Sequence, residues 1–483
     1  MSTDESFEDV FIDGVWSPAA STTFTAVIDP STEEVVAQVV MADSSDVDRA
    51  VRAARAALPK WAATPVAERV RHLEALADVI AARADAFTST ITTENGTPVR
   101  ESSAAAPHAA AFLRSTAEMA PLLEREDVRA NPVDDARTLV KSGPIGVVGV
   151  ITPWNFPLSL IIVKLGPALL AGCTVVVKPA PETPLAARLL AQACADAGLP
   201  PGVVNLVTGD IAAGEALVAH PGVDKVTFTG STAAGRRIGE VCGRSLTPVT
   251  LELGGKSAAV VLDDADPEVF AANLIKTTLR NTGQTCKAST RLILPRTRSD
   301  EFLDVVRRVL DDSPVGDPRD PATVFGPLVS ARQRERVEEY LQLGRDEGAT
   351  FVRGGGRPPG LDRGFYVEPT VLTDVSPTSR LAQEEIFGPV LVVFEHDGDD
   401  DAVRQANDSV YGLAGAVFSS DPDRALDVAC RIETGTVGIN HYGSNMTAPF
   451  SGHKDSGLGT DFGPEGLAQY RVLTSIHLRG RAA

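Results

Sequence analysis

The chain has 483 residues, 43% of them hydrophobic, and its 45 Lys and Arg against 64 Asp and Glu give a net charge of -19. This length predicts two or three domains, each with its own core. Because the negative charge repels phosphate backbones and anionic lipid surfaces, we expect neither nucleic acid nor a membrane as partner.

The amino-terminal segment is acidic and lacks the basic start and apolar run of a secretory signal, which predicts a cytoplasmic protein. The apolar stretch 158–171 is interrupted by Lys164 and Pro167 and is too short to span a membrane. The five cysteines form no CxxC pair and are odd in number, which indicates reduced, intracellular usage. Most of them are expected to be small buried residues.

The first elements are expected to be helices, because residues 46–58 and 66–87 carry apolar side chains at helical spacing. Residues 124–142 do not follow this pattern. With Pro132 and Asp134 near the centre of the segment, they favour extended strands around turns. This segment therefore predicts a projecting hairpin.

From residue 147 the pattern changes to strands that alternate with helices. The expected strands are 147–151, 174–178, 203–208, 225–230 and 249–253, and the helices include 184–198 and 233–241. Such alternation predicts a parallel sheet covered by helices on both faces. A second series has strands at 258–262, 290–294, 366–372 and 390–394 and helices at 267–282 and 332–348. It predicts a second α/β domain.

Several common motifs are absent. There is no HExxH or CxxC, so no metal site is expected, and the sequence Gly255-Lys256-Ser257 fails as a phosphate loop because Thr250 stands where a glycine is required. Five other segments occur in order along the chain: Pro153-Trp-Asn-Phe-Pro157, Phe228-Thr-Gly-Ser231, Leu251-Glu-Leu-Gly-Gly-Lys256, Gly283-Gln-Thr-Cys286 and Glu385-Ile-Phe-Gly-Pro389. Together they resemble the aldehyde dehydrogenase superfamily, and the resemblance extends from near residue 46 to residues 448–457.

This resemblance implies an α/β protein with the aldehyde dehydrogenase fold. It implies a Rossmann-like cofactor domain at 1–121 and 144–253, an α/β catalytic thiol domain at 254–466, and a small β oligomerisation arm at 122–143 and 467–483. Exposed strand edges of such an arm pair between subunits, so we expect a homo-oligomer, either a dimer or a tetramer.

Three residues are expected to carry the reaction. Cys286 follows a Gly and a Gln at the end of a predicted helix, where a loop thiol can attack a carbonyl carbon. The resemblance assigns it that role, and it places the Asn155 amide and the Cys286 N–H on the resulting oxyanion. Glu252 lies in an apolar segment, and burial would raise its pKa towards that of a general base. By resemblance it activates the water that hydrolyses a thioester, which favours a free carboxylic acid as product.

The expected cofactor site begins where the strand 225–229 turns through Gly230 and Ser231 into a helix, whose first N–H groups would face a pyrophosphate. Pro181 stands where many NAD-preferring members carry a glutamate, and it adds no charge that would repel a 2′-phosphate. NADP therefore stays open, although NAD is favoured. The cofactor-binding residues implied by the resemblance are Ile151, Trp154, Lys178, Gly230, Ser231, Glu385 and Phe387.

The substrate is expected to be a medium-sized hydrophobic aldehyde, because most residues at the family's tunnel positions are apolar. Arg280 and Lys287 differ, and either could recognise a carboxylate. A cation there could also lower the pKa of the thiol. The interpretation favoured for Arg280 is an ion pair with an acidic neighbour. The tunnel positions are Phe156, Leu160, Val163, Arg280, Thr285, Lys287 and Phe450.

Two further departures from the family pattern lie at residues 450–454, where the family usually has two glycines, and at Thr460, where an arginine is common. They affect local detail only. Two other functions stay as alternatives. A cysteine hydrolase acting on esters or amides would also use an activated thiol, but no histidine is placed in a recognisable pairing. An inactive binding protein on the same fold is disfavoured by the intact set of site residues.

Overall fold

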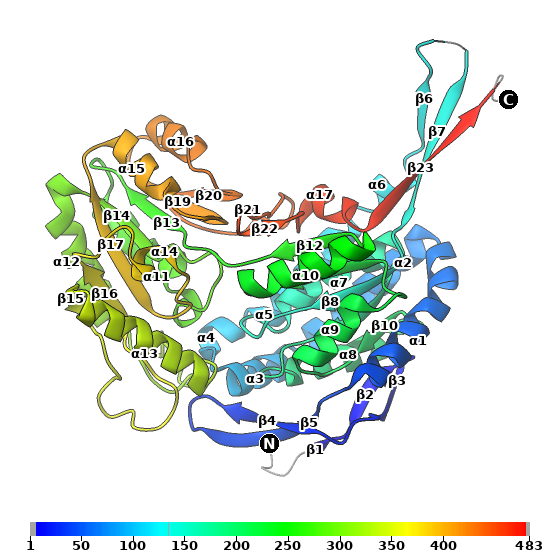
Figure 1. Ribbon diagram of the computed structural model, residues 1–483, viewed down its shortest axis with the longest axis horizontal. Helices are drawn as coiled ribbons and strands as arrows, with labels where there is room; N and C mark the ends of the chain where they lie inside the picture. Colours follow the sequence, from blue (N-terminus) through cyan, green and yellow to red (C-terminus); the bar gives the residue numbers. More distant parts are fainter. Residues whose placement is uncertain (1–5, 134, 480–483) are drawn as a thin grey trace.

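A computed structural model of the protein describes residues 6–133 and 135–479. Two large sheets, each covered by helices, lie at opposite ends of the long axis, and a narrow three-stranded sheet projects from one end (Figure 1). This arrangement confirms an α/β fold.

The first large sheet has eight strands in the order β22-β12-β11-β8-β9-β10-β2-β3. Its parallel centre consists of β8 (Val147–Ile151), β9 (Thr174–Lys178), β10 (Val204–Leu206), β11 (Lys225–Thr229) and β12 (Val249–Glu252). The antiparallel edge strands are β2 (Asp9–Ile12), β3 (Val15–Pro18) and β22 (Gly457–Leu458). The strands predicted in this region are therefore confirmed.

Alternate residues of these strands enter two separate cores, as the two-residue period of a strand requires. One face packs against α2 (Val66–Ala82), α5 (Ala105–Ala117), α7 (Ser159–Ala171) and α8 (Leu185–Asp196). The other face packs against α1 (Ser44–Ala63), α9 (Ile211–Ala219) and α10 (Thr232–Ser245). Helices on both faces leave the carboxyl ends of the parallel strands as the open edge, where polar side chains can gather.

The second large sheet has seven strands in the order β15-β16-β17-β14-β13-β19-β20. The parallel strands are β13 (Ala258–Val261), β14 (Arg291–Pro295), β16 (Thr370–Thr373), β17 (Val390–His396), β19 (Ala414–Phe418) and β20 (Thr436–Ile439), and β15 (Thr350–Arg353) is antiparallel. Its covering helices are α11 (Pro267–Thr278), α12 (Ser299–Asp311), α13 (Ala331–Asp346), α15 (Asp399–Asn407) and α16 (Pro422–Cys430).

The prediction that the chain opens with helices is wrong, because five strands precede α1. Besides β2 and β3 these are β1 (Ser6–Phe7), β4 (Phe24–Asp29) and β5 (Glu34–Val40). β2 pairs with β10 through Leu206 and Phe11, residues far apart in the sequence. Local periodicity carries no information about such a distant partner.

Three other boundaries differ from the prediction. The helix expected at 66–87 breaks at Arg83, and α3 (Ala84–Asn95) follows as a separate helix. The helix expected at 267–282 ends at Thr278 and is followed by a short 3-10 turn, η1 (Arg280–Gly283). The strand expected at 366–372 begins only at Thr370.

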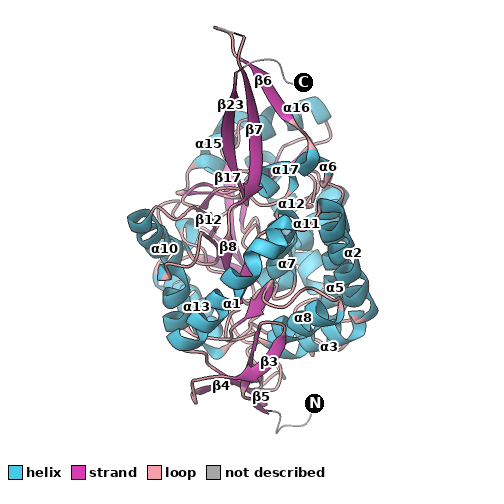
Figure 2. Cartoon of the chain, turned by 90° about the vertical axis from the view of Figure 1, so that its right-hand side faces the viewer, coloured by secondary structure: helices cyan, strands magenta, loops and turns pink. Residues whose placement is uncertain are grey.

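The projecting sheet contains the predicted hairpin, formed by β6 (Asp127–Ala130) and β7 (Arg137–Pro144). Asp134, in the expected turn, lies outside the described residues. The last strand, β23 (Arg471–Leu478), pairs antiparallel with the whole length of β7 (Figures 1 and 2). Across residues 6–133 and 135–479, no helix combines the length and the apolar character needed to cross a membrane.

Candidate active site

The candidate site lies at the carboxyl ends of the strands in the first sheet. Asn155 follows β8, Gly230 follows β11, and Glu252 is the last residue of β12. Cys286 reaches this region from the other side, on the loop that follows η1. The fold thus brings together residues that are far apart in the sequence.

The loop before the thiol has an unusual backbone. Asn281 and Thr282 are left-handed, with φ of 50° and 55°, and Gly283 follows with φ of 76°. A Cβ on Gly283 would lie 2.1 Å from the backbone oxygen of Gly388, so only glycine fits there. Two consecutive non-glycine residues in this region store conformational strain, which the surrounding contacts must hold in place.

Those contacts connect the thiol loop to the loop after β8. The side-chain amide of Asn281 donates to the backbone oxygen of Asn155 at 3.0 Å, and Thr97 Oγ donates to Asn281 Oδ1 at 3.1 Å. The amide of Asn155 donates in turn to the backbone oxygen of Gln284 at 3.0 Å. The two loops are therefore held in a fixed relation to each other.

The Asn155 side chain is buried, and its hydrogen-bond partner Gln284 lies two positions before Cys286 in the sequence. A carboxamide has two N–H donors, and only one is directed at Gln284. The second N–H can still donate to another acceptor, and it does so without any change of charge.

Cys286 is half-buried, and burial raises the pKa of its thiol to about 12. The Glu385 carboxyl contributes to this increase, whereas the Lys287 ammonium opposes it. The cationic neighbour considered from the sequence thus acts in the expected direction, but burial outweighs it. Of the other cysteines, Cys173, Cys194 and Cys242 are buried, and Cys430 is exposed.

The Glu252 carboxyl is buried, and its oxygens have no hydrogen-bond partner among the described residues. Burial, reinforced by the negative charge of Asp461, raises its pKa well above the usual range, while the Lys164 ammonium opposes this. The direction expected from the sequence is therefore confirmed. A carboxyl with a raised pKa can take a proton from water at neutral pH.

Lys164 and Asp461 form a buried ion pair near Glu252, with 2.8 Å between Lys164 Nζ and Asp461 Oδ2. In the sequence, Lys164 is visible only as an interruption of an apolar run, and no motif marks Asp461. A lysine in the middle of the apolar helix α7 was the available signal, because a fully buried lysine is rare without a partner.

The expected pyrophosphate position is the amino terminus of α10. Ser231 is the N-cap, and its Oγ accepts from Ala234 N at 3.3 Å. This 14-residue helix directs its dipole and its first amides at the end of β11. Ile151 is the last residue of the adjacent strand β8, where it is buried beside the end of β11.

The residues expected around the rest of the cofactor lie on both sides of the same edge. Glu385 Oε1 accepts from Gly255 N at 3.0 Å, and burial raises the pKa of this carboxyl to about 7. The Trp154 and Phe387 rings meet edge to face at 5.3 Å. Lys178 Nζ donates to the backbone oxygen of Gly209 at 2.7 Å, and burial lowers its pKa to about 8.

These groups fit a dinucleotide. A Cβ on Gly254 would lie 2.6 Å from Glu385 Oε2, so the glycine leaves room for the carboxylate that would accept bonds from ribose hydroxyls. The helix terminus suits the pyrophosphate, and Lys178 supplies a cation on the far side.

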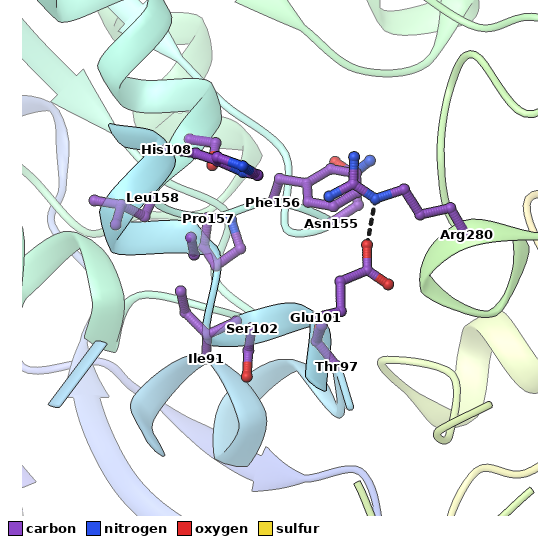
Figure 3. A pocket seen from close by; sticks show the side chains of 12 residues that line it. Ile91, Thr97, Glu101, Ser102, His108, Asn155, Phe156, Pro157, Leu158 and Arg280 are labelled. Atoms are coloured by element: carbon purple, nitrogen blue, oxygen red, sulfur yellow. Dashed lines mark hydrogen bonds and ion pairs between the residues drawn. The ribbon is translucent and has the colours of Figure 1, made fainter. Parts of the chain in front are cut away.

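A small cavity next to this edge is lined by α3, α4 (Val99–Ser102), α5, the loop after β8 and η1 (Figure 3). Two of the seven expected tunnel residues, Phe156 and Arg280, line it together with Asn155. Arg280 forms an ion pair with Glu101, which confirms the favoured interpretation of this arginine.

The other tunnel positions lie around this region without lining the cavity. Thr285 Oγ donates to the backbone oxygen of Arg280 at 3.0 Å, and Lys287 Nζ donates to Ser444 Oγ at 2.5 Å. The Phe450 ring packs against Phe462 at 5.6 Å. Leu160 and Val163 lie on α7.

A half-buried loop thiol, a buried carboxyl and a buried amide side chain thus lie near the edge of the first sheet where the amino terminus of α10 is located. The sequence model of the aldehyde dehydrogenase family matches residues 16–476. The chain belongs to this family and is an oxidoreductase that acts on aldehydes.

Individual relatives agree along nearly the whole chain. Geranial dehydrogenase of Castellaniella defragrans is 47% identical over 474 residues, covering 98% of each chain. A Mycobacterium tuberculosis aldehyde dehydrogenase complexed with NAD+ is 42% identical, with a TM-score of 0.96 over 99% of this chain and 100% of that one. A mutant of aldehyde dehydrogenase C from Pseudomonas syringae, in complex with NAD+ and octanal, is 40% identical, with a TM-score of 0.94 over 97% and 96%.

Proposed function

We propose that this enzyme oxidises an apolar aldehyde to the carboxylic acid with NAD, through a thiohemiacetal and then a thioester on Cys286. The observation that carries the proposal is the link between the loop of Asn155 and the loop of Cys286, which sets an amide donor beside a nucleophile. Glu252 at the end of β12 supplies the third group.

In the first step the Cys286 thiol loses its proton and its sulfur bonds to the carbonyl carbon. Because burial holds the thiol pKa near 12, the thiolate is the minor form, and the thiol proton leaves to solvent water before the sulfur attacks. The aldehyde oxygen becomes an oxyanion, which the free N–H of Asn155 and the Cys286 backbone N–H stabilise.

A bound NAD would supply the acceptor for the hydride of the tetrahedral carbon, which would leave a thioester on Cys286. The residues that would hold it are Ser231 and the α10 terminus at the pyrophosphate, Lys178 at the adenine ribose, and Glu385 with Phe387 at the nicotinamide half. Trp154, Ile151 and Gly230 complete that surface. Relatives with NAD+ bound support this choice, and because Pro181 places no acidic side chain at the ribose, NADP is tested beside NAD.

In the last step water attacks the thioester and the acid leaves, which regenerates the thiol. Glu252 takes a proton from that water. The raised pKa of its carboxyl fits a base that must hold a proton briefly. The neighbouring ion pair adjusts this pKa, since Asp461 raises it and Lys164 lowers it.

The names of two relatives support an apolar substrate, since one acts on geranial and another was crystallised with octanal. Phe156, Leu160, Val163 and Phe450 are apolar at the tunnel positions. The cysteine hydrolase and the inactive binding protein have no comparable support among the relatives.

The test is absorbance at 340 nm with octanal or geranial and with NAD or NADP in parallel. Cys286→Ala should give no reduced cofactor. Glu252→Gln should give a burst of at most one reduced cofactor per active site and then stall as an acyl-enzyme detectable by mass spectrometry. Cys430→Ala, at the exposed cysteine, is the matched control and should keep full turnover. Steady turnover by Cys286→Ala would refute the mechanism.

The remaining assignments extend the same proposal. We assign cofactor binding to the segments 1–121 and 144–253, the thiol to 254–466, and assembly to the arm at 122–143 and 467–483. The unpaired outer edges of β6 and β23 and their apolar side chains support a homo-oligomer, a dimer or a tetramer. The five cysteines, all free in the described residues, support a reducing, cytoplasmic location.

A further inference from the structure

Glu101, on α4, makes two contacts with the turn that precedes the thiol. Its Oε1 accepts from Arg280 Nε in an ion pair, and its Oε2 accepts from Asn281 N at 3.2 Å. The Arg280 side chain is 35% exposed and that of Glu101 20% exposed. The pair therefore lies in the wall of the cavity, shielded from bulk water without being sealed off.

Arg280 has a second partner in the same wall. Its guanidinium carbon lies 5.2 Å from the centre of the Phe156 ring, and Asn155 lines the cavity beside them. Figure 3 shows Arg280 reaching across Phe156, with the Glu101 carboxyl on its other side. The guanidinium is thus held at the cavity next to the oxyanion donor.

An arginine in this position would ordinarily attract a carboxylate, because its planar fork matches the two oxygens of that group. Here the negative charge of Glu101 offsets the positive charge of Arg280. Charges in a partly shielded wall interact more strongly than charges in open water. The net charge of Arg280 and Glu101 together therefore dominates the electrostatic energy of a charged ligand in the cavity. A ligand with a carboxylate would meet an occupied arginine and a repelling glutamate.

The other nearby cation does not replace Arg280 in this role. Lys287 is bound to Ser444 Oγ, and its ammonium lies 4.6 Å from the centre of the Tyr442 ring. Burial, together with the positive charge of Arg280, lowers its pKa to about 8. Lys287 therefore has its own partners and a reduced tendency to carry charge.

We propose that Glu101 is a specificity-determining residue, which neutralises Arg280 and so restricts the enzyme to aldehydes without a carboxylate. This inference rests on the proposed function, since it concerns the substrates of the same site. Glu101 acts through Arg280 and takes no part in the chemical steps, so its removal changes which aldehyde is bound and leaves the reaction itself intact.

The experiment compares two aldehydes of the same shape, 4-carboxybenzaldehyde and its neutral methyl ester, methyl 4-formylbenzoate. The wild type should prefer the ester. Glu101→Gln keeps the length of the side chain and an oxygen for Asn281 N, but it leaves Arg280 unpaired. We expect its ratio of kcat/KM, acid over ester, to rise about tenfold, equivalent to about 1.4 kcal/mol. The change should lie in KM of the acid.

Two further variants separate charge from structure. The double variant Glu101→Gln with Arg280→Met should lose the gain for the acid. Arg280→Met alone should lower the ratio below that of the wild type, because Glu101 is then unpaired and repels the acid. Glu268→Gln, which breaks an exposed ion pair with Arg308 far from the site, is the matched control and should leave the ratio unchanged.

The outcomes are distinct from those that test the proposed function. Oxidation of the ester by the wild type tests the function, whereas the acid-to-ester ratio tests Glu101. Dissociation constants of the two aldehydes, measured by calorimetry, give the same ratio without turnover. An unchanged ratio in Glu101→Gln, or an equal loss on both aldehydes, would show a purely structural role and overturn the inference. A wild type that prefers the acid would do the same.

Discussion

Asn281 donates a hydrogen bond from its side-chain amide to the backbone oxygen of Asn155 at 3.0 Å, and this bond joins the thiol loop to the loop of the proposed oxyanion donor. The residue also accepts from Thr97 Oγ and adopts a left-handed backbone, which asparagine tolerates better than most residues. One side chain thus supports both the shape of its own loop and the position of the neighbouring one.

Replacing Asn281 by Ala should therefore reduce both stability and rate. We expect the free energy of unfolding to fall by about 1 to 2 kcal/mol, from the lost hydrogen bonds and the less tolerant backbone. We expect kcat to fall about tenfold because the thiol and the amide donor are no longer held in register. Urea unfolding and steady-state kinetics measure the two effects. Asn273→Ala, which removes only an exposed bond within α11, should change neither.

The buried pair of Lys164 and Asp461 predicts a large and asymmetric mutational effect. Asp461→Leu leaves the Lys164 ammonium buried without its partner, which should cost about 3 to 5 kcal/mol of stability. Adding Lys164→Met removes the stranded charge and should restore most of that loss. Thermal and urea unfolding of the single and double variants check this.

Activity should not recover in the same double variant, because the charges near Glu252 stay absent. Asp461 raises the pKa of the Glu252 carboxyl more than Lys164 lowers it, so the loss of both charges should shift the pH dependence of thioester hydrolysis to lower pH. Single-turnover measurements of acyl-enzyme decay report this step directly. A double variant with normal decay at every pH would contradict the assignment of this pair to the hydrolytic step.

Cofactor affinity should depend on pH through Glu385. Burial raises the pKa of this carboxyl to about 7, and only its ionised form accepts bonds from both ribose hydroxyls. As the pH falls from about 8 to about 6, protonation should weaken NAD binding by up to about tenfold per unit below the pKa. Calorimetric titration of the wild type gives the profile. Glu385→Gln, with an acceptor that does not titrate, should give weaker binding that is nearly flat in pH.

The arm should set the oligomeric state. Leu473, the third residue of β23, is 69% exposed although it is a large apolar residue. Leu473→Asp places a charge on this strand and should shift the protein to a smaller assembly, seen by light scattering after size exclusion. Leu426→Asp on α16, at a side chain that is 54% exposed, is the matched control. Equal masses for wild type and Leu473→Asp would locate the interface elsewhere.

The elements that local patterns describe were predictable. The strands β8, β9 and β11 are short apolar runs bounded by turns, and the sequence places each to within a residue. The motif around Cys286 and the position of Glu252 in an apolar segment indicated a reactive thiol and a buried acid. The structure adds the electrostatic balance, in which burial outweighs Lys287 at the thiol.

What could not be predicted depends on distant partners. Arg280-Asn-Thr-Gly283 looks like the continuation of a helix, and its left-handed turn exists because Glu101, Thr97 and Asn155 hold it from other segments. Lys164 and Asp461 are 297 positions apart, so neither identifies the other in the sequence. The acidic neighbour expected for Arg280 could be anticipated as a type, but not as Glu101.

The short strand β22 has a mechanical consequence. The chain leaves the first sheet after β12 and returns to it at β22, which pairs with β12 itself. The two large sheets are therefore tied by two covalent connections that meet at a single pair of strands, close to Glu252. A single cut by a protease in either connection would leave the two sheets covalently linked by the other. Any rotation of one sheet relative to the other is expected to take place about these two neighbouring connections.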